Sequence, residues 1–271
     1  MMHDVDTSQK GDTAPLCRSE ITDDDFLGGQ LKVLQPVRGY RAGLDAVLLA
    51  AAVEANSDRR TRVLDVGAGV GTVGLCVARR LPFAEVVLFE REAALVDLAR
   101  ENITRNGLEG RVRACLGEVG ARAGHYLERE GLKDGSFTHV LANPPFFDGG
   151  SATRSASKLR AAAHVMDGGD FEVWGRFLAR MAGPAGQALV IHKADALAKV
   201  LAGLEGRFGR IRVLPIRPRP GENANRVIVS GIRGSKAPLS VLPGFVLHGD
   251  GNGFTPAAEA ILREGRGLYP K

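Results

Sequence analysis

Short apolar runs, each followed by a stretch with apolar residues at helical spacing, dominate the middle of this chain. The runs contain mostly Val, Leu, Ala and Phe, and they are short enough to favour buried strands over helices. Strands that alternate with helices predict an α/β fold built on a mostly parallel sheet. The predicted strands are residues 62–66, 85–89, 112–116, 137–142 and 187–192. The predicted helices are residues 46–55, 72–80, 92–106, 171–182 and 195–204.

The two ends of the chain carry a different pattern. Residues 26–37 alternate around two glycines, which predicts a short N-terminal hairpin. Residues 210–216 and 226–232 are strand-like and flank a loop with two prolines, a residue type excluded from central strands. We therefore expect an antiparallel C-terminal hairpin, followed by a last helix at residues 255–263.

The composition is that of an ordinary globular protein, with 271 residues, 44% hydrophobic and 25% charged. We expect a flexible segment at residues 1–21 and a single domain at residues 22–271. The longest apolar run, Ala46–Val53, is too short to span a bilayer, and the first residues lack the pattern of a signal peptide. The three cysteines are widely spaced and form no CxxC pair, so we expect reduced thiols, no metal site and a cytoplasmic location.

Charge divides the chain unevenly. Residues 1–150 hold 18 Lys and Arg against 22 Asp and Glu, whereas residues 151–271 hold 18 against 9. A basic half rich in arginine fits a polyanionic partner, because the guanidinium binds phosphate through two parallel hydrogen bonds. An arginine-rich solvated surface is the alternative interpretation. The candidates for phosphate contact are Arg154, Lys158, Arg160, Arg217, Arg219 and Arg226.

Polar or glycine residues follow each of the first four predicted strands. Because the carboxyl ends of parallel strands meet at one edge of a sheet, these groups predict a pocket shaped for a nucleoside. Glycines let the backbone approach a ligand closely, and a carboxylate at a strand end can accept both hydroxyls of a ribose. Each group considered separately has a structural alternative: the glycines as an ordinary turn, and the glutamates as solvated loop residues. The groups are Asp65, Gly67 and Gly69, then Glu90, then Glu118, then Asn143.

The fourth of these strands ends in Asn143-Pro144-Pro145-Phe146. Each proline fixes its own φ, removes a backbone donor and pushes the preceding residue towards an extended conformation. The result is a stiff corner with one amide, a free carbonyl and a flat aromatic surface. A rigid turn whose Asn caps the chain and whose Phe belongs to the core is the alternative.

A dinucleotide cofactor is a competing interpretation of the glycine run. Gly69-x-Gly71-x-x-Gly74 formally fits the dinucleotide fingerprint, and Glu90 lies near the expected offset. That register begins two residues late relative to the strand, and the register from Gly67 has Thr72 in place of its third glycine. No motif for hydride transfer follows, so an NAD-dependent oxidoreductase is the weaker alternative.

Together, the groups at the four strand ends resemble those of class I S-adenosylmethionine-dependent methyltransferases that act on a planar nitrogen. The stretches 35–36, 39–50 and 238–256 are similar to those of the bacterial tRNA adenine-N6 methyltransferases that modify the adenosine beside the anticodon. The resemblance covers about residues 22–264. It implies a Rossmann-like sheet that ends in an antiparallel hairpin, S-adenosyl-L-methionine as cofactor, and tRNA or another RNA as partner.

The resemblance also implies roles for individual residues. Asp65, Gly67 and Gly69 would line the methionine and ribose of the cofactor, Glu90 would hold the ribose hydroxyls, and Glu118 would reach the adenine. Many family members have Asp in place of Glu118. Tyr40, Arg41 and Asp45 would lie near the methionine or the target base, although Asp45 alternatively caps a helix. Asn143, Pro144, Pro145 and Phe146 would form the catalytic corner, with Asn143 also near the cofactor.

The chemistry of an exocyclic adenine amine suits this corner. Its lone pair is delocalised into the ring, and the Asn143 side-chain oxygen and the Pro144 carbonyl can both accept from the NH₂ group. Phe146 can stack on the base, and the cofactor already activates the methyl group, so positioning supplies most of the rate. Protein glutamine, RNA guanine N2, DNA adenine and small molecules are alternative acceptors, and a non-catalytic RNA-binding module is the alternative outside enzymes.

Overall fold

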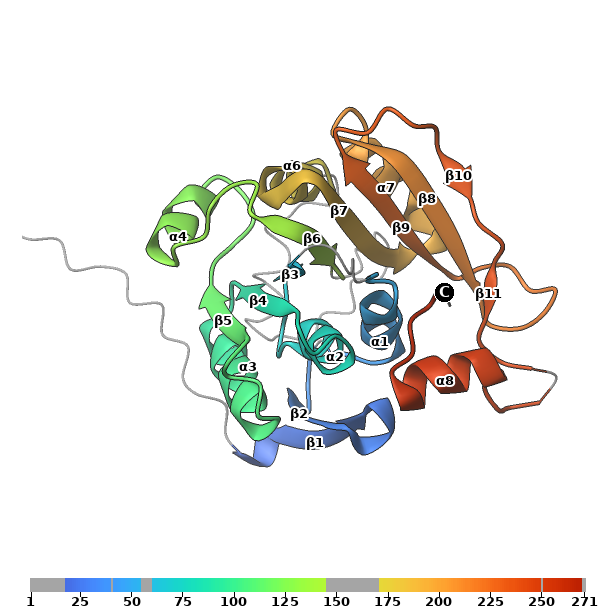
Figure 1. Cartoon of the computed structure of the whole chain (residues 1–271). Helices are drawn as coiled ribbons and strands as arrows, with labels where there is room; N and C mark the ends of the chain where they lie inside the picture. Colours follow the sequence, from blue (N-terminus) through green and yellow to red (C-terminus); the bar gives the residue numbers. More distant parts are fainter. Residues whose placement is uncertain (1–17, 40, 55–59, 145–170, 250, 270–271) are drawn as a thin grey trace, which may run out of the picture.

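The computed structural model describes residues 18–39, 41–54, 60–144, 171–249 and 251–269, and one large sheet lies at its centre (Figure 1). The strands of this sheet are β3 (Arg62–Val66), β4 (Glu85–Glu90), β5 (Val112–Leu116), β6 (Phe137–Ala142), β7 (Ala182–Lys193), β8 (Phe208–Arg217), β9 (Arg226–Arg233), β10 (Ser240–Val241) and β11 (Phe245–Val246). Their order is β10-β8-β9-β7-β6-β3-β4-β5, with β11 also paired to β8. Neighbouring strands are parallel except at β9, which is antiparallel to both β7 and β8. The predicted α/β sheet with its antiparallel C-terminal hairpin is confirmed.

The apolar runs form central strands because both faces of the sheet are covered. Val63 of β3 and Leu141 of β6 belong to one buried cluster. Their neighbours along the chain, Leu64 and Val140, belong to a second cluster. Side chains alternate between the two faces of a strand. A strand that is buried on both faces is therefore apolar at nearly every position.

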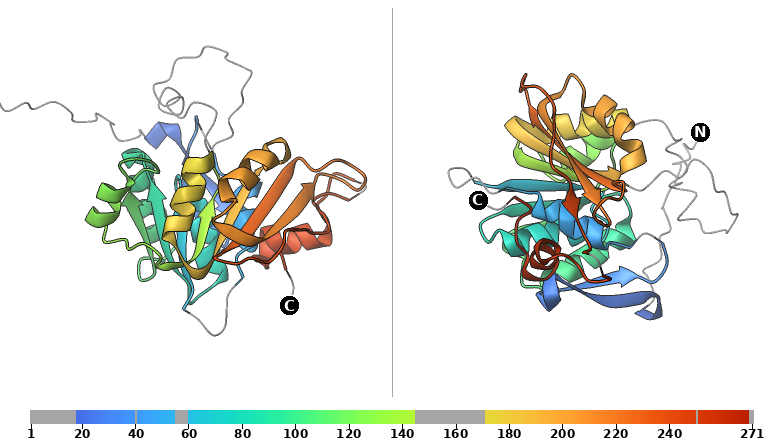
Figure 2. Two further views of the ribbon diagram at one scale, coloured as in Figure 1. Left: turned by 90° about the horizontal axis from the view of Figure 1, so that it is seen from above. Right: turned by 90° about the vertical axis from the view of Figure 1, so that its right-hand side faces the viewer.

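Helices cover the two faces as separate layers (Figures 1 and 2). The first cluster takes its helical residues from α1 (Leu44–Ala51), α2 (Thr72–Arg80), α3 (Ala93–Arg105) and α8 (Pro256–Glu264). The second takes them from α4 (Ala123–Arg129), α6 (Phe171–Met181) and α7 (Leu197–Leu204). We call the side of the sheet covered by α1, α2 and α3 the α1 face.

The predicted N-terminal hairpin is present as a second, two-stranded sheet of β1 (Ile21–Phe26) and β2 (Leu31–Pro36), and it packs outside α3. Two asparagines hold it there, Asn102 in α3 and Asn106 at the C-terminal cap of that helix. Asn102 Oδ1 accepts from the N–H of Leu34 at 2.7 Å, and Asn106 Oδ1 accepts from the N–H of Lys32 at 3.0 Å. Both side-chain amides also donate to the carbonyls of the same two β2 residues. The outer edge of β2 is thus paired by side chains.

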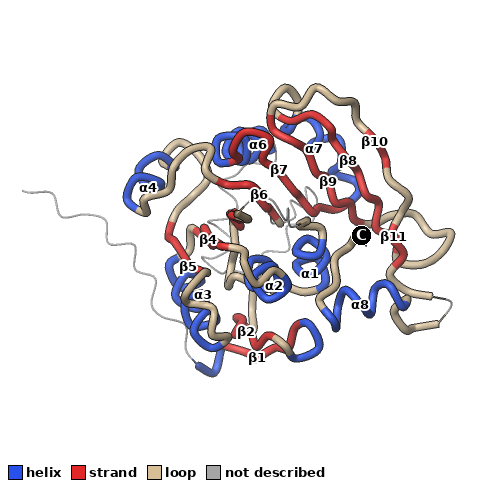
Figure 3. Tube along the Cα trace, viewed as in Figure 1, coloured by secondary structure: helices blue, strands red, loops and turns tan. Residues whose placement is uncertain are grey.

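Several boundaries differ from the sequence-based prediction for physical reasons. β7 begins five residues early, because Ala182 already pairs with Phe137 before a bulge in β7, where residues 182–187 lie opposite residues 137–139. The helix α4 is not predicted from the sequence, since only two of its residues are buried and its apolar stripe is too short to show. Residues 239–247 form two brief strands in a mostly loop segment (Figure 3). The 3-10 turns are Arg18–Glu20, Leu27–Gly29 and Ala194–Ala196.

Candidate functional site

The strand order reverses beside β3, because β4 and β5 lie on one side of it and β6 and β7 on the other. Loops that follow neighbouring parallel strands separate at such a point and leave room for a ligand at the carboxyl edge. Val66 of β3 pairs with Phe89 of β4 and Ala142 of β6, so the residues after these three form one row. They are Gly67, Glu90 and Asn143, and together with Gly69 and Glu118 we call them the strand-end site.

The glycine turn after β3 is shaped by two different constraints. Gly67 and Gly69 have φ angles of 70° and 57°, in the left-handed region that side chains disfavour. A Cβ atom on Gly67 would lie 2.9 Å from the ring of Trp174, a buried residue of α6. A Cβ atom on Gly69 would meet no atom of the described residues within 4 Å. Gly67 is therefore required by packing, whereas Gly69 borders open space that a ligand can approach.

Glu90 is fixed by backbone amides on both sides of it. Its Oε2 accepts from the N–H of Gly69 at 2.8 Å, and its Oε1 accepts from the N–H groups of Arg91 and Glu92 at 2.8 and 3.0 Å. Burial raises the pKa of the Glu90 carboxyl, and the three N–H donors act against this shift. The carboxylate thus joins the glycine turn to the end of β4 in a set orientation.

Asp65 lies beneath the glycine turn and is almost completely buried. Its Oδ2 accepts from the N–H of Gly74 in α2 at 2.9 Å. Burial raises the pKa of Asp65 to about 7; the Gly74 bond lowers it and the nearby Glu90 charge raises it further. In the described contacts Asp65 ties β3 to α2, so a role beside the cofactor stays a prediction.

Glu118 lies just beyond β5 and is partly exposed, with 26% of its side chain accessible. Its Oε1 accepts from Nε of Arg122 at 2.7 Å. Gly117, directly before it, packs against the ring of Phe89, and a Cβ atom there would come within 2.2 Å of that ring. The backbone before Glu118 is therefore held against β4, on the same edge as Glu90.

Asn143 and Pro144 are both buried at the end of β6, and 8% of Asn143 is accessible. The apolar strand that leads to them is paired on both sides, with β3 and β7, so the position of Asn143 is set by the centre of the sheet. The remaining predicted site residues Pro145, Phe146, Tyr40, Arg154, Lys158 and Arg160 lie outside the described residues.

The structure brings together two predicted residues that are 181 positions apart. Nε of Arg226, at the start of β9, lies 3.0 Å from Oδ2 of Asp45, in the first turn of α1. The helix cap is Gly43, without a side-chain bond, so the interpretation of Asp45 as a cap was wrong. Arg226 faces a carboxylate here, although the sequence pointed to a phosphate.

Arg41 is bound to the N-terminal hairpin. Its guanidinium donates to Asp24 Oδ2 at 2.6 Å and to Thr22 Oγ1 at 2.7 Å. Gln35 holds the adjoining chain, since its Oε1 accepts from the N–H of Ala42 at 2.8 Å. These contacts fix the segment that leads from β2 to α1, and the predicted contact between Arg41 and the cofactor is not tested by them.

The two remaining basic candidates differ in their surroundings. Arg219 donates to the carbonyl of Gly249 at 3.1 Å and to that of Gly251 at 2.5 Å, so it orders the loop before α8. Arg217, at the end of β8, is exposed. Arg217 is therefore more accessible to a large partner than Arg219.

Two residues near the site escaped the sequence analysis. Asn102, which is fully buried in α3, donates from Nδ2 to the carbonyl of Val70 at 3.1 Å as well as to β2, so it links the glycine turn to the hairpin. Trp174 packs over Gly67. An amide within the apolar stripe of a predicted helix was the available signal for Asn102, whereas Trp174 looked like any core residue.

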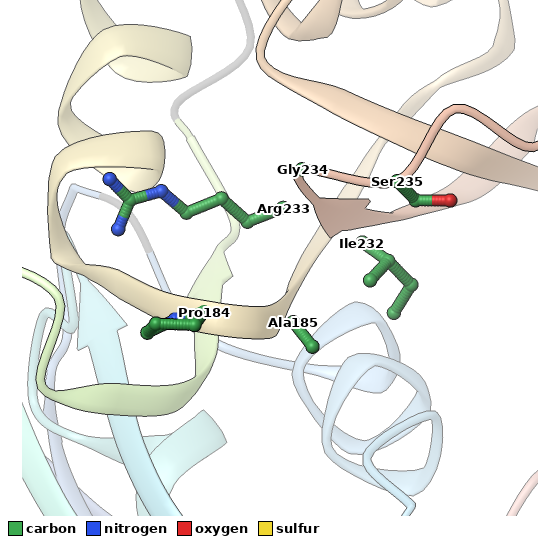
Figure 4. A pocket seen from close by; sticks show the side chains of 6 residues that line it. All are labelled: Pro184, Ala185, Ile232, Arg233, Gly234 and Ser235. Carbon is green, nitrogen blue, oxygen red and sulfur yellow. The ribbon is translucent and has the colours of Figure 1, made fainter.

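The pocket shown in Figure 4 lies away from this site. It is lined by Pro184, Ala185, Ile232, Arg233, Gly234 and Ser235. These residues belong to the start of β7, to the end of the antiparallel β9 and to the turn directly after it, so the pocket opens at the amino edge of the parallel strands. Among the described residues there is no cluster of His, Cys, Asp and Glu suited to a metal ion, and no helix long and apolar enough to cross a membrane.

Comparison with known proteins finds a methyltransferase family and several methyltransferases. The sequence model of the methyltransferase small domain family matches residues 43–179, just over half of the chain. A solved structure of a predicted O-methyltransferase from Agrobacterium tumefaciens is 33% identical, with a TM-score of 0.68, and the match covers 84% of this chain and 99% of that one.

Two kinds of RNA methyltransferase are among the relatives. The tRNA1(Val) (adenine(37)-N6)-methyltransferase of Shewanella frigidimarina is 28% identical over 196 residues, which is 71% of this chain and 74% of the relative. The ribosomal RNA small subunit methyltransferase C of Haemophilus influenzae is 30% identical over 117 residues, which is 41% of this chain. The chain spans about a third of the length of this second relative, 31%.

Proposed function

We propose that this chain, which belongs to the methyltransferase small domain family and uses S-adenosyl-L-methionine, methylates the exocyclic N6 amine of an adenosine in tRNA. One observation carries this proposal. Asn143 and Pro144 are buried at the switch point of the sheet, in the row of residues that also contains Glu90. The similarity to the tRNA-specific relative, which extends over 74% of that protein, supports the choice of acceptor.

The residues of the strand-end site suit an S-adenosyl nucleoside. Gly69 borders open space, and the neighbouring carboxylate of Glu90 is held by three backbone amides. An ionised carboxylate can accept from two adjacent hydroxyls, which is the donor pattern of a ribose. We assign Gly67 and Gly69 to the methionine and ribose end of the cofactor, Glu90 to the ribose and Glu118 to the adenine.

The proposed chemistry needs two acceptors beside one amine. When bound, the cofactor supplies a methyl group that its sulfonium already activates. The side-chain oxygen of Asn143 and the carbonyl of Pro144 accept from the NH₂ group and turn its lone pair out of conjugation with the ring. Both residues are buried, so water competes little for these bonds.

Positioning carries the remaining catalytic effect. In this proposal the base stacks on Phe146, and the two prolines keep the corner rigid between turnovers. The amine loses a proton only after its nitrogen has formed the new bond, when it is acidic enough to release that proton to solvent, so no strongly basic side chain is required at the corner. The chain's contribution is thus the fixed orientation of a weak nucleophile.

The basic C-terminal half supports an RNA partner. Residues 151–271 contain 18 Lys and Arg residues and only 9 Asp and Glu residues. We assign Arg217 to phosphate contact because it is exposed beside the carboxyl edge, and we keep Arg154, Lys158 and Arg160 as candidates. Arg219 serves the 249–252 loop, so its contact with RNA would be secondary. A tRNA substrate fits an enzyme of the cytoplasm.

A ribosomal RNA base is the second candidate acceptor. The observation that favours it is the 30% identity to ribosomal RNA small subunit methyltransferase C, which covers 117 residues. The longer match to the tRNA-specific relative favours tRNA over this alternative.

Methyl transfer to purified acceptors tests the proposal. The protein and methyl-labelled cofactor are incubated in parallel with unmodified tRNA, unmodified small-subunit ribosomal RNA, DNA and a protein extract. We expect label in tRNA, and nucleoside analysis should assign it to N6-methyladenosine. Label confined to ribosomal RNA would establish the second candidate, and label in protein or DNA would refute both.

A further inference from the structure

An ion pair connects the first turn of α1 to the beginning of β9. Nε of Arg226 lies 3.0 Å from Oδ2 of Asp45, and the two side chains are 26% and 18% accessible. Arg226 also donates from Nη1 to the carbonyl of Asn225 at 3.1 Å. The guanidinium is therefore held by its own loop and by α1 together.

This pair lies at the same edge of the sheet as the strand-end site. Arg226 pairs with Lys193, the last residue of β7, and three residues earlier in β7 Val190 pairs with Ala142. Asn143 follows Ala142 directly. Arg226 is thus two strands across and two residues further along the sheet from Asn143, about 12 Å in all, which a side chain from each direction can span.

The pair also lies on the same face of the sheet as the site. Leu141 of β6 and Ile228 of β9 both belong to the buried cluster of the α1 face. Because side chains alternate along a strand, Asn143 and Arg226, each two residues away, are directed to that face as well. Asp45 reaches it from α1 itself. Edge and face together bring the ion pair beside the catalytic corner.

We propose that Arg226 is a positioning residue, which holds the Asp45 carboxylate in place to receive the ammonium group of the cofactor's methionine. The inference rests on the proposed cofactor site. A carboxylate has about four acceptor positions, so Asp45 can accept from Arg226 at Oδ2 and from an ammonium group at Oδ1. Without the guanidinium, the Asp45 side chain has a choice of rotamers, and its charge is presented to the ligand in only some of them.

An RNA phosphate is the less suitable partner for Arg226. To bind it, the guanidinium would have to leave a carboxylate at 3.0 Å or bring a second anion against it. Arg217 is exposed, and no carboxylate of the described residues forms a salt bridge with it. We therefore assign the phosphate contact expected from the sequence to Arg217 and not to Arg226.

Cofactor binding to four variants tests this inference. The full chain is prepared as Arg226→Gln, Arg226→Lys, Asp45→Asn and the Arg226→Gln/Asp45→Asn double variant, and S-adenosyl-L-methionine is titrated calorimetrically without any acceptor. The matched control is Arg233→Gln, at the other end of β9, where the guanidinium donates to the carbonyl of Ala182. Melting temperatures are measured for each protein.

We expect Arg226→Gln and Asp45→Asn each to raise the cofactor Kd about tenfold, and the double variant to add little, because the two residues act as a unit. Arg226→Lys should recover part of the affinity, and Arg233→Gln should bind like the wild type. With a working acceptor, KM for the cofactor should rise while kcat at saturation changes about twofold or less. The RNA salt slope of Arg226→Gln should equal that of the wild type.

An unchanged cofactor Kd in Arg226→Gln would overturn the inference. So would a salt dependence of RNA binding that is weaker than that of the wild type by about one phosphate contact. If Arg226→Gln does not fold, a wild-type Kd in Asp45→Asn would overturn it equally. The Kd is measured without acceptor, so it decides the role of Arg226 whether or not tRNA is the substrate.

Discussion

At the scale of single residues, the proposed chemistry depends on two buried oxygens, the side-chain oxygen of Asn143 and the carbonyl of Pro144. Only the first can be removed by substitution without altering the backbone. Asn143 follows a strand that is paired on both sides, so the loss of its amide should leave the sheet intact. Its variants therefore report on chemistry more than on folding.

We predict that Asn143→Ala lowers kcat by a factor on the order of 10²–10³, the usual cost of one lost polar contact in a transition state. Single-turnover methyl transfer measures this directly. Asn143→Asp, which keeps an acceptor oxygen, should retain more activity than Asn143→Ala. The cofactor Kd should stay within about twofold of wild type. Equal turnover by Asn143→Ala and wild type would contradict the assignment.

Glu90 gives a second test at this scale. Glu90→Gln keeps the size of the side chain but removes the negative charge that strengthens its hydrogen bonds from three backbone amides. Since each such bond is worth about 1.5–3 kcal/mol, we expect the cofactor Kd to rise tenfold or more and the melting temperature to fall. Calorimetric titration and thermal unfolding measure both effects. A variant that binds the cofactor like wild type would remove Glu90 from the site.

Asp65 predicts a pH dependence of stability. Its pKa is about 7 in the fold because burial disfavours the charge, against 3.8 in a model compound. Between these values the folded state binds more protons than the unfolded state, so this group makes stability fall as pH rises from about 4 to 7. We expect Asp65→Asn to show a shallower fall over this range than wild type in urea unfolding. Parallel curves for the two proteins would show that Asp65 does not titrate there.

At the scale of elements, the glycine turn after β3 combines a packing constraint and a binding constraint in neighbouring positions. Gly67 lies against Trp174, and Gly69 borders open space. The two glycines look alike in sequence, and only the packing of α6 against the turn separates their roles. Their alanine variants form a matched pair.

Gly67→Ala must accommodate both a left-handed backbone and a Cβ atom 2.9 Å from the Trp174 ring, whereas Gly69→Ala faces the backbone cost alone. We predict a loss of stability of about 2–4 kcal/mol for Gly67→Ala and about 1–2 kcal/mol for Gly69→Ala. Gly69→Ala should nevertheless weaken the cofactor, because its methyl group enters the space assigned to it. Urea unfolding measures the loss of stability, and calorimetry measures the affinity for the cofactor. A stable Gly69→Ala variant with wild-type affinity would contradict the assignment of the space beside Gly69 to the cofactor.

The elements also show what sequence patterns can and cannot supply. The parallel strands were predicted because a strand buried on two faces is a continuous apolar run. The strand-end site was then predicted because its residues come directly after these runs. The α4 helix was missed because its apolar stripe comprises only Ala123 and Leu127. The early start of β7 depends on a pairing with Phe137 that no local pattern encodes.

At the scale of the whole molecule, the family and the row of strand-end groups could be predicted, whereas the long-range contacts could not. Asp45 and Arg226 were each singled out, but their contact depends on how α1 packs on the sheet over β7, the neighbour of β9. Arg41 was expected near the cofactor or the target base, and its contact with Asp24 of the hairpin was not foreseen. Such pairings depend on tertiary packing, which spacing along the chain does not reveal.

The molecule as a whole places its proposed catalytic corner at the centre of the sheet and its excess of positive charge in the C-terminal half. Arg217 lies at the carboxyl edge, the same edge as Asn143. This arrangement suits a large anionic substrate that offers one base to the corner while its backbone lies along the basic half.

The most direct test is nucleoside analysis of tRNA treated with the wild-type protein and with Asn143→Ala. Unmodified tRNA is incubated with each protein and S-adenosyl-L-methionine, digested to nucleosides and examined by mass spectrometry. We predict N6-methyladenosine with the wild type and a reduction on the order of 10²-fold or more in its rate of formation with the variant. A methyl group on any other nucleoside, or equal amounts of N6-methyladenosine at equal rates, would contradict the account.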